Sequence, residues 1–343
     1  MPLSVGAQIT YISDREGPTL RKAMKEIRPT GIIGIPALWD VLEKRIKSQV
    51  EDRSEAAKIL FKASTALNRQ ARYLGLNLGP TLFSEVHKNL GGQIRYLISG
   101  GAALNQQTLD IFEGLGFELL EGYGLTEAAP VLAVRRPGDR KGSGSVGKAL
   151  PQVKIKIKDP DAEGIGEVLA RGPNVMQGYL DQADATAAVL KDGWLYTGDL
   201  GYLDQNQQLV LTGRSKELIV TSSGKNVYPD ELEPIFADHP FIKEISIVGI
   251  PDPQGDERVA ALIVLTEEAP EEAHSEIKAH INVINAVRAD HQRLRTYRFW
   301  PTDLPRTATR KIQRTQVKLE LLRLLEVSKE TRRVASQHTH QSL

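Results

Sequence analysis

The sequence predicts an α/β protein, chiefly because short apolar strands alternate with amphipathic helices over the first 130 residues. Such alternation is typical of a parallel sheet whose strands are joined by crossover helices. A composition of 41% hydrophobic and 25% charged residues is that of a globular protein with room for roughly two or three domains. The predicted elements of this part are a strand at 7–12, a helix at 20–27, a strand at 31–35, a helix at 38–50, a strand at 94–98, a helix at 105–113 and a strand at 117–121.

Changes in the pattern of apolar and polar residues divide the chain into four predicted parts. After the first part, short strands separated by turns replace the alternation, as in a small β-rich subdomain, and a mixed α+β module follows. The closing residues are polar and predict a disordered tail. We therefore expect a partial α/β subdomain at 1–130, a β-rich subdomain at 131–213, a carboxy-terminal domain at 214–330 and a tail at 331–343.

Charge and cysteine content exclude several classes of function. Lys+Arg 44 against Asp+Glu 43 gives a net charge of +1, so we expect no nucleic-acid partner. Without cysteine the chain has no disulfide and no catalytic thiol. The seven histidines show no metal-binding spacing, and no apolar run approaches the roughly 20 residues that span a bilayer. These features favour a soluble, cytoplasmic enzyme.

The stretch EGYGLTEAAP at residues 121–130 is the first candidate site. It follows an apolar run, so it should leave the carboxyl end of a strand, where open α/β sheets bind ligands. Gly122 and Gly124 would let the backbone approach a ligand closely. Thr126 offers a hydroxyl to a phosphate, and Glu127 offers a hard oxygen ligand of the kind that magnesium prefers. A capped loop without a ligand is the alternative at this point.

Two glycine-rich turns give opposite predictions. Gly100 and Gly101 follow a neighbouring strand, where backbone could hold a planar base, although close packing is the alternative reason for glycine. Residues 142–148, GSGSVGK, match the spacing of a phosphate-binding loop. We reject that match, because Ala149 replaces the required hydroxyl residue and residues 153–158 alternate like a strand where the motif needs a helix.

Asp199 is a further candidate, since it follows a glycine between apolar neighbours in WLYTGDL. A lone carboxylate can accept both hydroxyls of a ribose, whereas the alternative is an Asx turn. Residues 212–220 then form a charged break between two apolar runs, which suits a domain boundary. Residues 304–312 form a polar, basic loop that enters a helix.

These pieces, in this order, resemble the adenylate-forming ligases, the family of acyl-CoA synthetases, luciferases and nonribosomal-peptide adenylation enzymes. The chain is most similar to the long-chain fatty acid branch, over nearly its whole length. The resemblance is carried by YGLTE at 123–127, TGD at 197–199, GRSKE at 213–217 and TRKI at 309–312. It implies a large domain with a small distorted β-barrel subdomain, followed by a mobile carboxy-terminal lid.

The resemblance also implies an activity. A medium- or long-chain fatty acid would attack ATP to give an acyl-adenylate, with Mg²⁺ as the metal. The acyl group would then pass from AMP to a thiol, that of coenzyme A or of an acyl carrier protein. A nonribosomal adenylation module is a less favoured reading, because the motifs lean towards the fatty acid branch.

Each matching residue has an implied role. Thr126 would contact phosphate and Glu127 would hold magnesium, while Asp199 would bind the ribose with the help of Arg214. Lys311 would be delivered to the carboxylate and the α-phosphate by rotation of the lid. The remaining implied residues are Gly100, Gly101, Tyr123 and Gly124 around the nucleotide and the acyl head, Lys216 as the hinge, and Gly224 in the loop used for the thiol step.

Two departures from the family pattern qualify these roles. Arg310 stands where the family commonly has glycine, which leaves open which cation of this loop acts. Family members carry a Ser/Thr/Gly-rich loop ending in lysine upstream of the segment that matches residues 1–50, and nothing in this sequence matches that loop. We therefore expect an amino-terminally truncated chain with an exposed edge strand and apolar surface at 7–35. The alternative function is an inactive or split-enzyme fragment that binds AMP or a complementary amino-terminal polypeptide. For residues 311–327, peripheral membrane contact is an alternative to ordinary helix packing.

Overall fold

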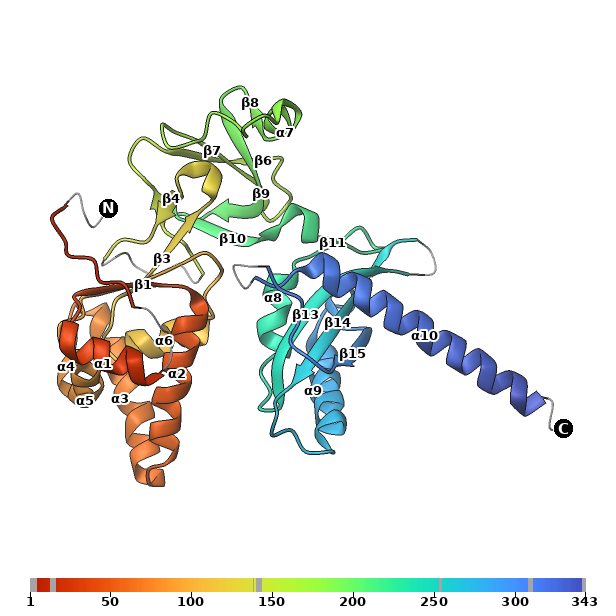
Figure 1. Ribbon diagram of the computed structural model, residues 1–343, viewed down its shortest axis with the longest axis horizontal. Helices are drawn as coiled ribbons and strands as arrows, with labels where there is room; N and C mark the ends of the chain where they lie inside the picture. Colours follow the sequence, from red (N-terminus) through yellow and green to blue (C-terminus); the bar gives the residue numbers. More distant parts are fainter. Residues whose placement is uncertain are drawn as a thin grey trace. The chain divides into compact units, whose positions relative to one another are not determined.

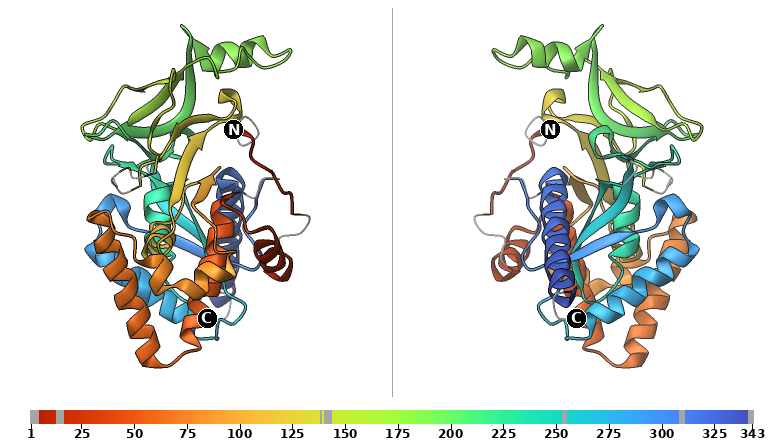
Figure 2. Two further views of the ribbon diagram at one scale, coloured as in Figure 1. Left: turned by 90° about the vertical axis from the view of Figure 1, so that its left-hand side faces the viewer. Right: turned by 90° about the vertical axis from the view of Figure 1, so that its right-hand side faces the viewer.

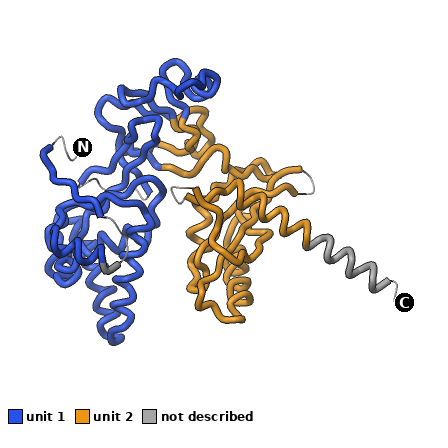
Figure 3. The backbone as a smooth tube through the Cα atoms, in the orientation of Figure 1, with its two compact units in different colours: residues 1–156, 169–196, 203–210 blue, residues 157–168, 197–202, 211–343 orange. Residues whose placement is uncertain are grey.

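The computed structural model describes residues 5–12, 17–137, 139, 144–252, 255–307 and 311–340. The chain forms two compact units, which Figure 3 distinguishes by colour. Unit 1 comprises residues 1–156, 169–196 and 203–210, and unit 2 comprises residues 157–168, 197–202 and 211–343.

Unit 1 contains a five-stranded sheet in the order β1-β2-β3-β4-β5 (Figure 1). The first three strands are parallel, as the sequence predicted, and the last two are antiparallel. The sequence placed residues 131–213 in the β-rich part, whereas β4 and β5 extend this first sheet. The strands are β1 (Gly31–Gly34), β2 (Tyr96–Gly100), β3 (Leu119–Gly124), β4 (Val131–Val134) and β5 (Lys148–Ala149).

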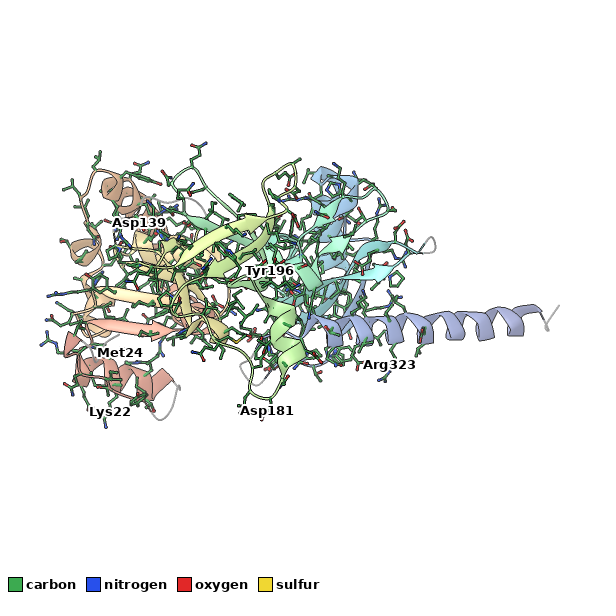
Figure 4. All side chains as sticks on the ribbon, turned by 90° about the horizontal axis from the view of Figure 1, so that it is seen from above. Lys22, Met24, Asp139, Asp181, Tyr196 and Arg323 are labelled. Atoms are coloured by element: carbon green, nitrogen blue, oxygen red, sulfur yellow. The ribbon has the colours of Figure 1, made fainter. Side chains whose placement is uncertain are left out.

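Helices precede and separate the parallel strands of unit 1. The predicted helices at 20–27, 38–50 and 105–113 are confirmed, and Asn105 caps the last of them by accepting a hydrogen bond from the Gln107 amide at 2.8 Å. On the first helix, Met24 is buried and Lys22 is exposed (Figure 4). The helices are α1 (Gly17–Ile27), α2 (Pro36–Glu51), α3 (Glu55–Tyr73), α4 (Gly79–Leu82), α5 (Ser84–Asn89) and α6 (Gln106–Gly114).

The core of unit 1 lies on one face of its sheet. Trp39 of α2 and Phe112 of α6 are fully buried there, together with Leu97 of β2. β1 is the edge strand, and Ile33 on its other face is 67% exposed, which confirms the expected exposed edge. Residues 7–12 form no strand, however, because no described strand pairs with them.

A second sheet has the order β10-β9-β7-β6, with β8 paired to β9. Strand β6 begins at Lys154, which agrees with rejecting a phosphate-binding loop at 142–148, where the motif would require a helix. The elements are β6 (Lys154–Lys158), β7 (Gly166–Arg171), α7 (Ala183–Val189), β8 (Leu190–Lys191), β9 (Trp194–Leu203) and β10 (Leu209–Arg214).

Unit 2 contains a three-stranded sheet, β13-β14-β15, with α8 and α9 on one face and α10 on the other (Figures 1 and 2). The strands alternate between two apolar clusters: Ile247 of β13 packs towards α8 and α9, while its neighbour Val248 packs towards α10. The elements are η3 (Ser215–Glu217), β11 (Ile219–Val220), β12 (Asn226–Val227), α8 (Pro229–Phe236), β13 (Ile242–Pro251), β14 (Glu257–Leu265), α9 (Ala273–Val287), η4 (Asp290–Gln292), β15 (Thr296–Trp300) and α10 (Arg314–His340).

The two long helices of unit 2 differ in part from the sequence prediction. On α9, the apolar residues Ile277 and Ile281 are buried, but Val287 at its last position is 81% exposed. On α10, Val317 and Leu321 are buried against the sheet, so ordinary packing accounts for its apolar face. The helix extends to His340, through positions at which we expected a disordered tail. In the part of the chain that the structure describes, no helix is long and apolar enough to cross a membrane.

Candidate functional site

Thr126 and Glu127 lie in a tight hairpin loop between β3 and β4 in unit 1. A hydrogen bond from the Leu125 amide to the Pro130 carbonyl closes this loop at 2.8 Å. A 3-10 turn, η2 (Thr126–Ala128), forms the tip, where the threonine is exposed and the glutamate is half-buried. The loop therefore presents a hydroxyl and a carboxylate on adjacent residues.

The loop is shorter than the sequence predicted. We expected the strand to end at Glu121, but β3 continues to Gly124 because its last residues pair with β4. A Cβ atom on Gly124 would lie 1.9 Å from the Pro130 carbonyl oxygen. The glycine is therefore required by the close approach of the hairpin's own backbone.

Glu127 is held in place by residues from the segment between β7 and α7. The Tyr179 hydroxyl donates a hydrogen bond to Glu127 Oε1 at 2.8 Å, and the Met176 amide donates one to the Glu127 carbonyl at 2.8 Å. The Asn174 side chain donates to two carbonyls of the hairpin at 2.9 and 2.8 Å. The hydrogen bond to Glu127 raises the pKa of Tyr179 above its usual value. We did not predict Tyr179 or Asn174, because a single polar residue far from the hairpin in the sequence gives no sign that it will contact the hairpin.

Gly100 and Gly101 lie at the carboxyl end of β2, at the same edge of the sheet as the hairpin. A Cβ atom on Gly100 would meet its nearest neighbour, the Gly122 carbonyl oxygen, at an ordinary 3.7 Å, so packing alone does not require glycine there. Gly101 has φ +90°, which does favour glycine. Tyr123 is only 7% exposed and belongs to the core.

A buried carboxyl group lies just before the hairpin. Burial raises the pKa of Glu121 to about 7, although the nearby Arg135 guanidinium opposes the rise. Arg135 is itself paired with Glu113 at 3.1 Å, and both side chains are buried. Burial therefore outweighs the attraction of the guanidinium, and Glu121 retains a proton more readily than an exposed glutamate.

Asp199 lies within β9 of unit 2, where it is 6% exposed. Arg214, the last residue of β10, pairs with it through Nε at 3.1 Å from Oδ1. The preceding Gly198 has φ +70° and open space around its Cα, so it is the backbone conformation that favours glycine. Asp199 lies in a strand rather than in the turn of the alternative reading. Arg214, which we expect to help it bind ribose, contacts its carboxylate, and the ribose role stays a prediction.

The remaining predicted residues of unit 2 are exposed. Lys216 lies in η3, directly after β10. Gly224 has φ +68° in a turn that is closed by its own amide donating to the Thr221 carbonyl at 2.8 Å. Lys311 lies in a loop in which its amide donates to Thr307 Oγ1 at 3.1 Å.

The predicted residues are divided between the two units. Arg310, which departs from the family pattern, lies outside the described residues. Unit 1 holds Gly100, Gly101, Tyr123, Gly124, Thr126 and Glu127, and unit 2 holds Asp199, Arg214, Lys216, Gly224 and Lys311.

The hairpin donors fit a magnesium ion better than a softer metal. Thr126 and Glu127 supply hydroxyl and carboxylate oxygens, which are hard ligands. Among the residues that the structure describes, no group of three or more histidine, aspartate or glutamate side chains could hold a metal ion by itself. That is the usual situation for Mg²⁺, which is bound by one or two carboxylates together with substrate phosphates.

Two family matches cover most of the chain. Residues 1–180 match the AMP-binding enzyme family, and residues 231–311 match the AMP-binding enzyme C-terminal domain. These ranges include both the hairpin and the Lys311 loop.

Curated relatives include ligases for different acids. The chain is 34% identical over 279 residues to a long-chain-fatty-acid–CoA ligase of Bacillus subtilis, covering 78% of this chain and 47% of that protein. It is 34% identical over 231 residues to an indoleacetate–CoA ligase of Aromatoleum aromaticum, covering 66% of this chain and 44% of that protein. The chain thus spans about half the length of the relatives it matches.

A solved structure gives the same result for the fold. The O-succinylbenzoate coenzyme A synthetase of Bacillus subtilis, in complex with ATP and magnesium ion, aligns with a TM-score of 0.64 at 25% identity, covering 87% of this chain and 53% of that one. Fold, motifs and family matches agree, and the chain belongs to the AMP-binding enzyme family.

Proposed function

We propose that the chain activates a medium- or long-chain fatty acid with ATP and transfers the acyl group to a thiol such as coenzyme A. The observation that carries this proposal is the hairpin in which Glu127 is fixed by Tyr179 beside the exposed Thr126. The choice of a fatty acid is supported by the relative named as a long-chain-fatty-acid–CoA ligase, while other relatives are named for different acids.

In the proposed reaction a carboxylate oxygen of the acid attacks the α-phosphorus of ATP. The bond from the α-phosphorus to the bridging oxygen breaks, and pyrophosphate leaves. The sulfur of the thiol then attacks the acyl carbonyl carbon, AMP leaves with the bonding electron pair, and the thiol proton goes to solvent. A bound Mg²⁺ would neutralise phosphate charge during the first step.

The residues of unit 1 would bind the nucleotide phosphates and base. Thr126 would donate its hydroxyl to a phosphate oxygen, and Glu127 would supply a carboxylate oxygen to magnesium. Gly100 and Gly101 would lie against adenine, where the absence of a side chain leaves room, and Tyr123 and Gly124 would complete that edge of the site.

The residues of unit 2 would bind the ribose and supply the mobile cation. Asp199 would accept the ribose hydroxyls, with Arg214 fixing the carboxylate. Lys216 would be the hinge of the lid, and Gly224 would lie in the loop used for the thiol step. Lys311, which is exposed at its loop, would stabilise charge on the α-phosphate during adenylation.

Pyrophosphate release tests this function directly. The purified chain would be assayed with ATP, Mg²⁺ and one acid at a time, comparing dodecanoate and hexadecanoate with indoleacetate and o-succinylbenzoate. We expect release that depends on a fatty acid. A preference for an aromatic acid would overturn the substrate assignment, and no release with any acid would overturn the activity.

Lys311→Ala tests the proposed cation. Loss of one aimed electrostatic group costs about 10²–10³ in rate, so the adenylation rate should fall by that factor. Lys278→Ala, which removes an exposed lysine from α9, is the matched control and should change nothing. An unchanged rate in the Lys311 variant would assign adenylation to another cation.

One observation favours a second candidate function. Ile33 is 67% exposed on the edge strand β1, and an edge strand can pair with another chain. A fragment that completes a separate amino-terminal polypeptide would use this edge. Pyrophosphate release that appears only after a separately expressed amino-terminal half is added would support this second function over the first.

A further inference from the structure

Arg314, the first residue of α10, is bound by three carboxylates although it occurs in no motif that we assigned. Its guanidinium makes a bidentate pair with Glu233, with Nε 3.2 Å from Oε1 and Nη2 2.7 Å from Oε2. It also pairs with Glu217 and with Asp230. Only 15% of the arginine side chain is exposed. A planar guanidinium that satisfies several carboxylates in a buried position has one geometry, and lysine cannot reproduce it.

The three carboxylates come from two different elements of unit 2. Glu217 is the last residue of η3 and follows Lys216 directly, whereas Asp230 and Glu233 lie on α8. The Glu233 carboxylate also accepts a hydrogen bond from the Ile247 amide of β13 at 2.8 Å. Arg314 therefore links the start of α10 to the segment after Lys216, and links both to the core sheet.

The loop that carries Lys311 is anchored at both of its ends. On the amino-terminal side, Arg306 Nη2 pairs with Glu244 Oε1 of β13 at 2.6 Å. On the carboxy-terminal side, the Gln313 amide donates to the Pro305 carbonyl at 2.8 Å, and Arg314 follows at once. Lys311 is exposed three residues before this buried arginine. Its amine is thus presented from a loop whose base is fixed.

We propose that Arg314 is a positioning residue that fixes the base of the Lys311 loop and couples it to the segment directly after Lys216. The inference rests on the proposed function, in which Lys216 is the hinge and Lys311 the mobile cation. Any rotation about Lys216 then also moves the Lys311 loop, because Glu217 and Arg314 connect the two segments rigidly. Without the connection, the loop and the hinge segment fluctuate independently.

Amide hydrogen exchange of the full chain tests this coupling without requiring activity. Arg314→Lys keeps the charge but loses the bidentate geometry, so we expect exchange about tenfold faster in residues 304–316 and in residues 215–221. Glu217→Ala removes only the hinge-side partner. We expect it to speed exchange in residues 215–221 and to leave residues 304–316 as in the wild type.

Lys318→Met is the matched control, because Lys318 also lies on α10 and pairs with a carboxylate, Glu257, at 2.7 Å. It should leave both segments unchanged. The proposal fails if residues 304–316 exchange at the wild-type rate in Arg314→Lys, or if Lys318→Met has the same effect as Arg314→Lys. It fails equally if residues 215–221 exchange at the wild-type rate in Arg314→Lys.

Half-reaction rates then separate positioning from a general loss of structure. Arg314→Lys should slow adenylation at least about tenfold, because that step uses Lys311, and should leave thiol transfer from added acyl-adenylate within about twofold of the wild type. Equal losses in both half-reactions would show a merely structural role. If the wild-type chain releases no pyrophosphate with any acid, the proposed function fails, while the exchange experiment still decides whether Arg314 makes the connection.

Discussion

The sheet β1-β2-β3-β4-β5 of unit 1 and the sheet β13-β14-β15 of unit 2 both contain apolar strands, but they bury the side chains of those strands differently. In unit 2, adjacent residues of β13 such as Ile247 and Val248 are buried on opposite faces, because helices cover both sides of the sheet. In unit 1, Ile32 of β1 packs against the core but its neighbour Ile33 is 67% exposed. Apolar residues therefore predict a strand in both sheets, whereas burial of the second face of each sheet depends on which helices cover it.

The largest expected effect tests this comparison by replacing one isoleucine in each sheet. Ile247→Ala removes a side chain with 0% exposure and should lower the free energy of unfolding by about 2–5 kcal/mol through lost burial and a residual cavity. Ile33→Ala removes an exposed side chain and should change it by less than about 0.5 kcal/mol. Denaturant unfolding of each variant, monitored by far-UV circular dichroism, gives the two values. Similar losses in both variants would show that Ile33 is covered in solution.

A somewhat smaller effect concerns the buried carboxyl group of the first sheet. Because the pKa of Glu121 is raised to about 7, the folded state binds its proton more tightly than the unfolded state does. Stability should therefore fall as the pH rises from about 4.5 through about 7, by up to about 3 kcal/mol for a rise from 4.5 to 7.

Glu121→Gln should remove this pH dependence, since the amide does not titrate. The measurement is the free energy of unfolding at several pH values between 4 and 8. Glu118→Gln is the matched control, because Glu118 lies just outside the same strand and is partly exposed in its pair with Arg72. A pH profile that is the same in the Glu121 variant and the wild type would contradict the raised pKa.

The smallest effect concerns the support of the hairpin. Tyr179→Phe removes one hydrogen bond to the Glu127 carboxylate and should cost about 1 kcal/mol of unfolding free energy. Tyr73→Phe removes the hydroxyl of a tyrosine that is 73% exposed and should cost nothing measurable. Thermal unfolding of the two variants side by side would show the difference, and equal midpoints would mean that the Tyr179 hydrogen bond contributes no stability.

Sequence reasoning predicted the local parts of the fold well, because periodicity and caps are local signals. It predicted helices at 38–50 and 105–113, close to the bounds of α2 and α6 in the structure. It missed β15 at 296–300, whose parallel pairing with β14 depends on a segment more than 30 residues away. It also ended β3 too early, since the pairing with β4 cannot be read from β3 alone.

The candidate site likewise contains residues that the sequence predicted and residues that it did not. Thr126, Glu127, Asp199 and Lys311 were predicted because each lies in a short motif. Tyr179 and Arg314 were not, because their meaning comes only from partners 52 to 97 positions away. Their residue types are common on protein surfaces, and no spacing distinguishes them before the chain is folded.

The hairpin glycine has a consequence for how this motif is used in comparing sequences. At Gly124 the space for a side chain is filled by the Pro130 carbonyl oxygen, so closure of the hairpin requires a glycine at this position. A search that scores the second glycine of EGYGLTE is therefore detecting a hairpin. It would also accept proteins that keep this hairpin but do not bind a nucleotide. Under the proposed function, the threonine and the glutamate that follow are the residues of this loop that contact the ligand. If that function holds, weighting those two positions above the glycine selects for the ligand contacts, whereas the glycine selects for the turn.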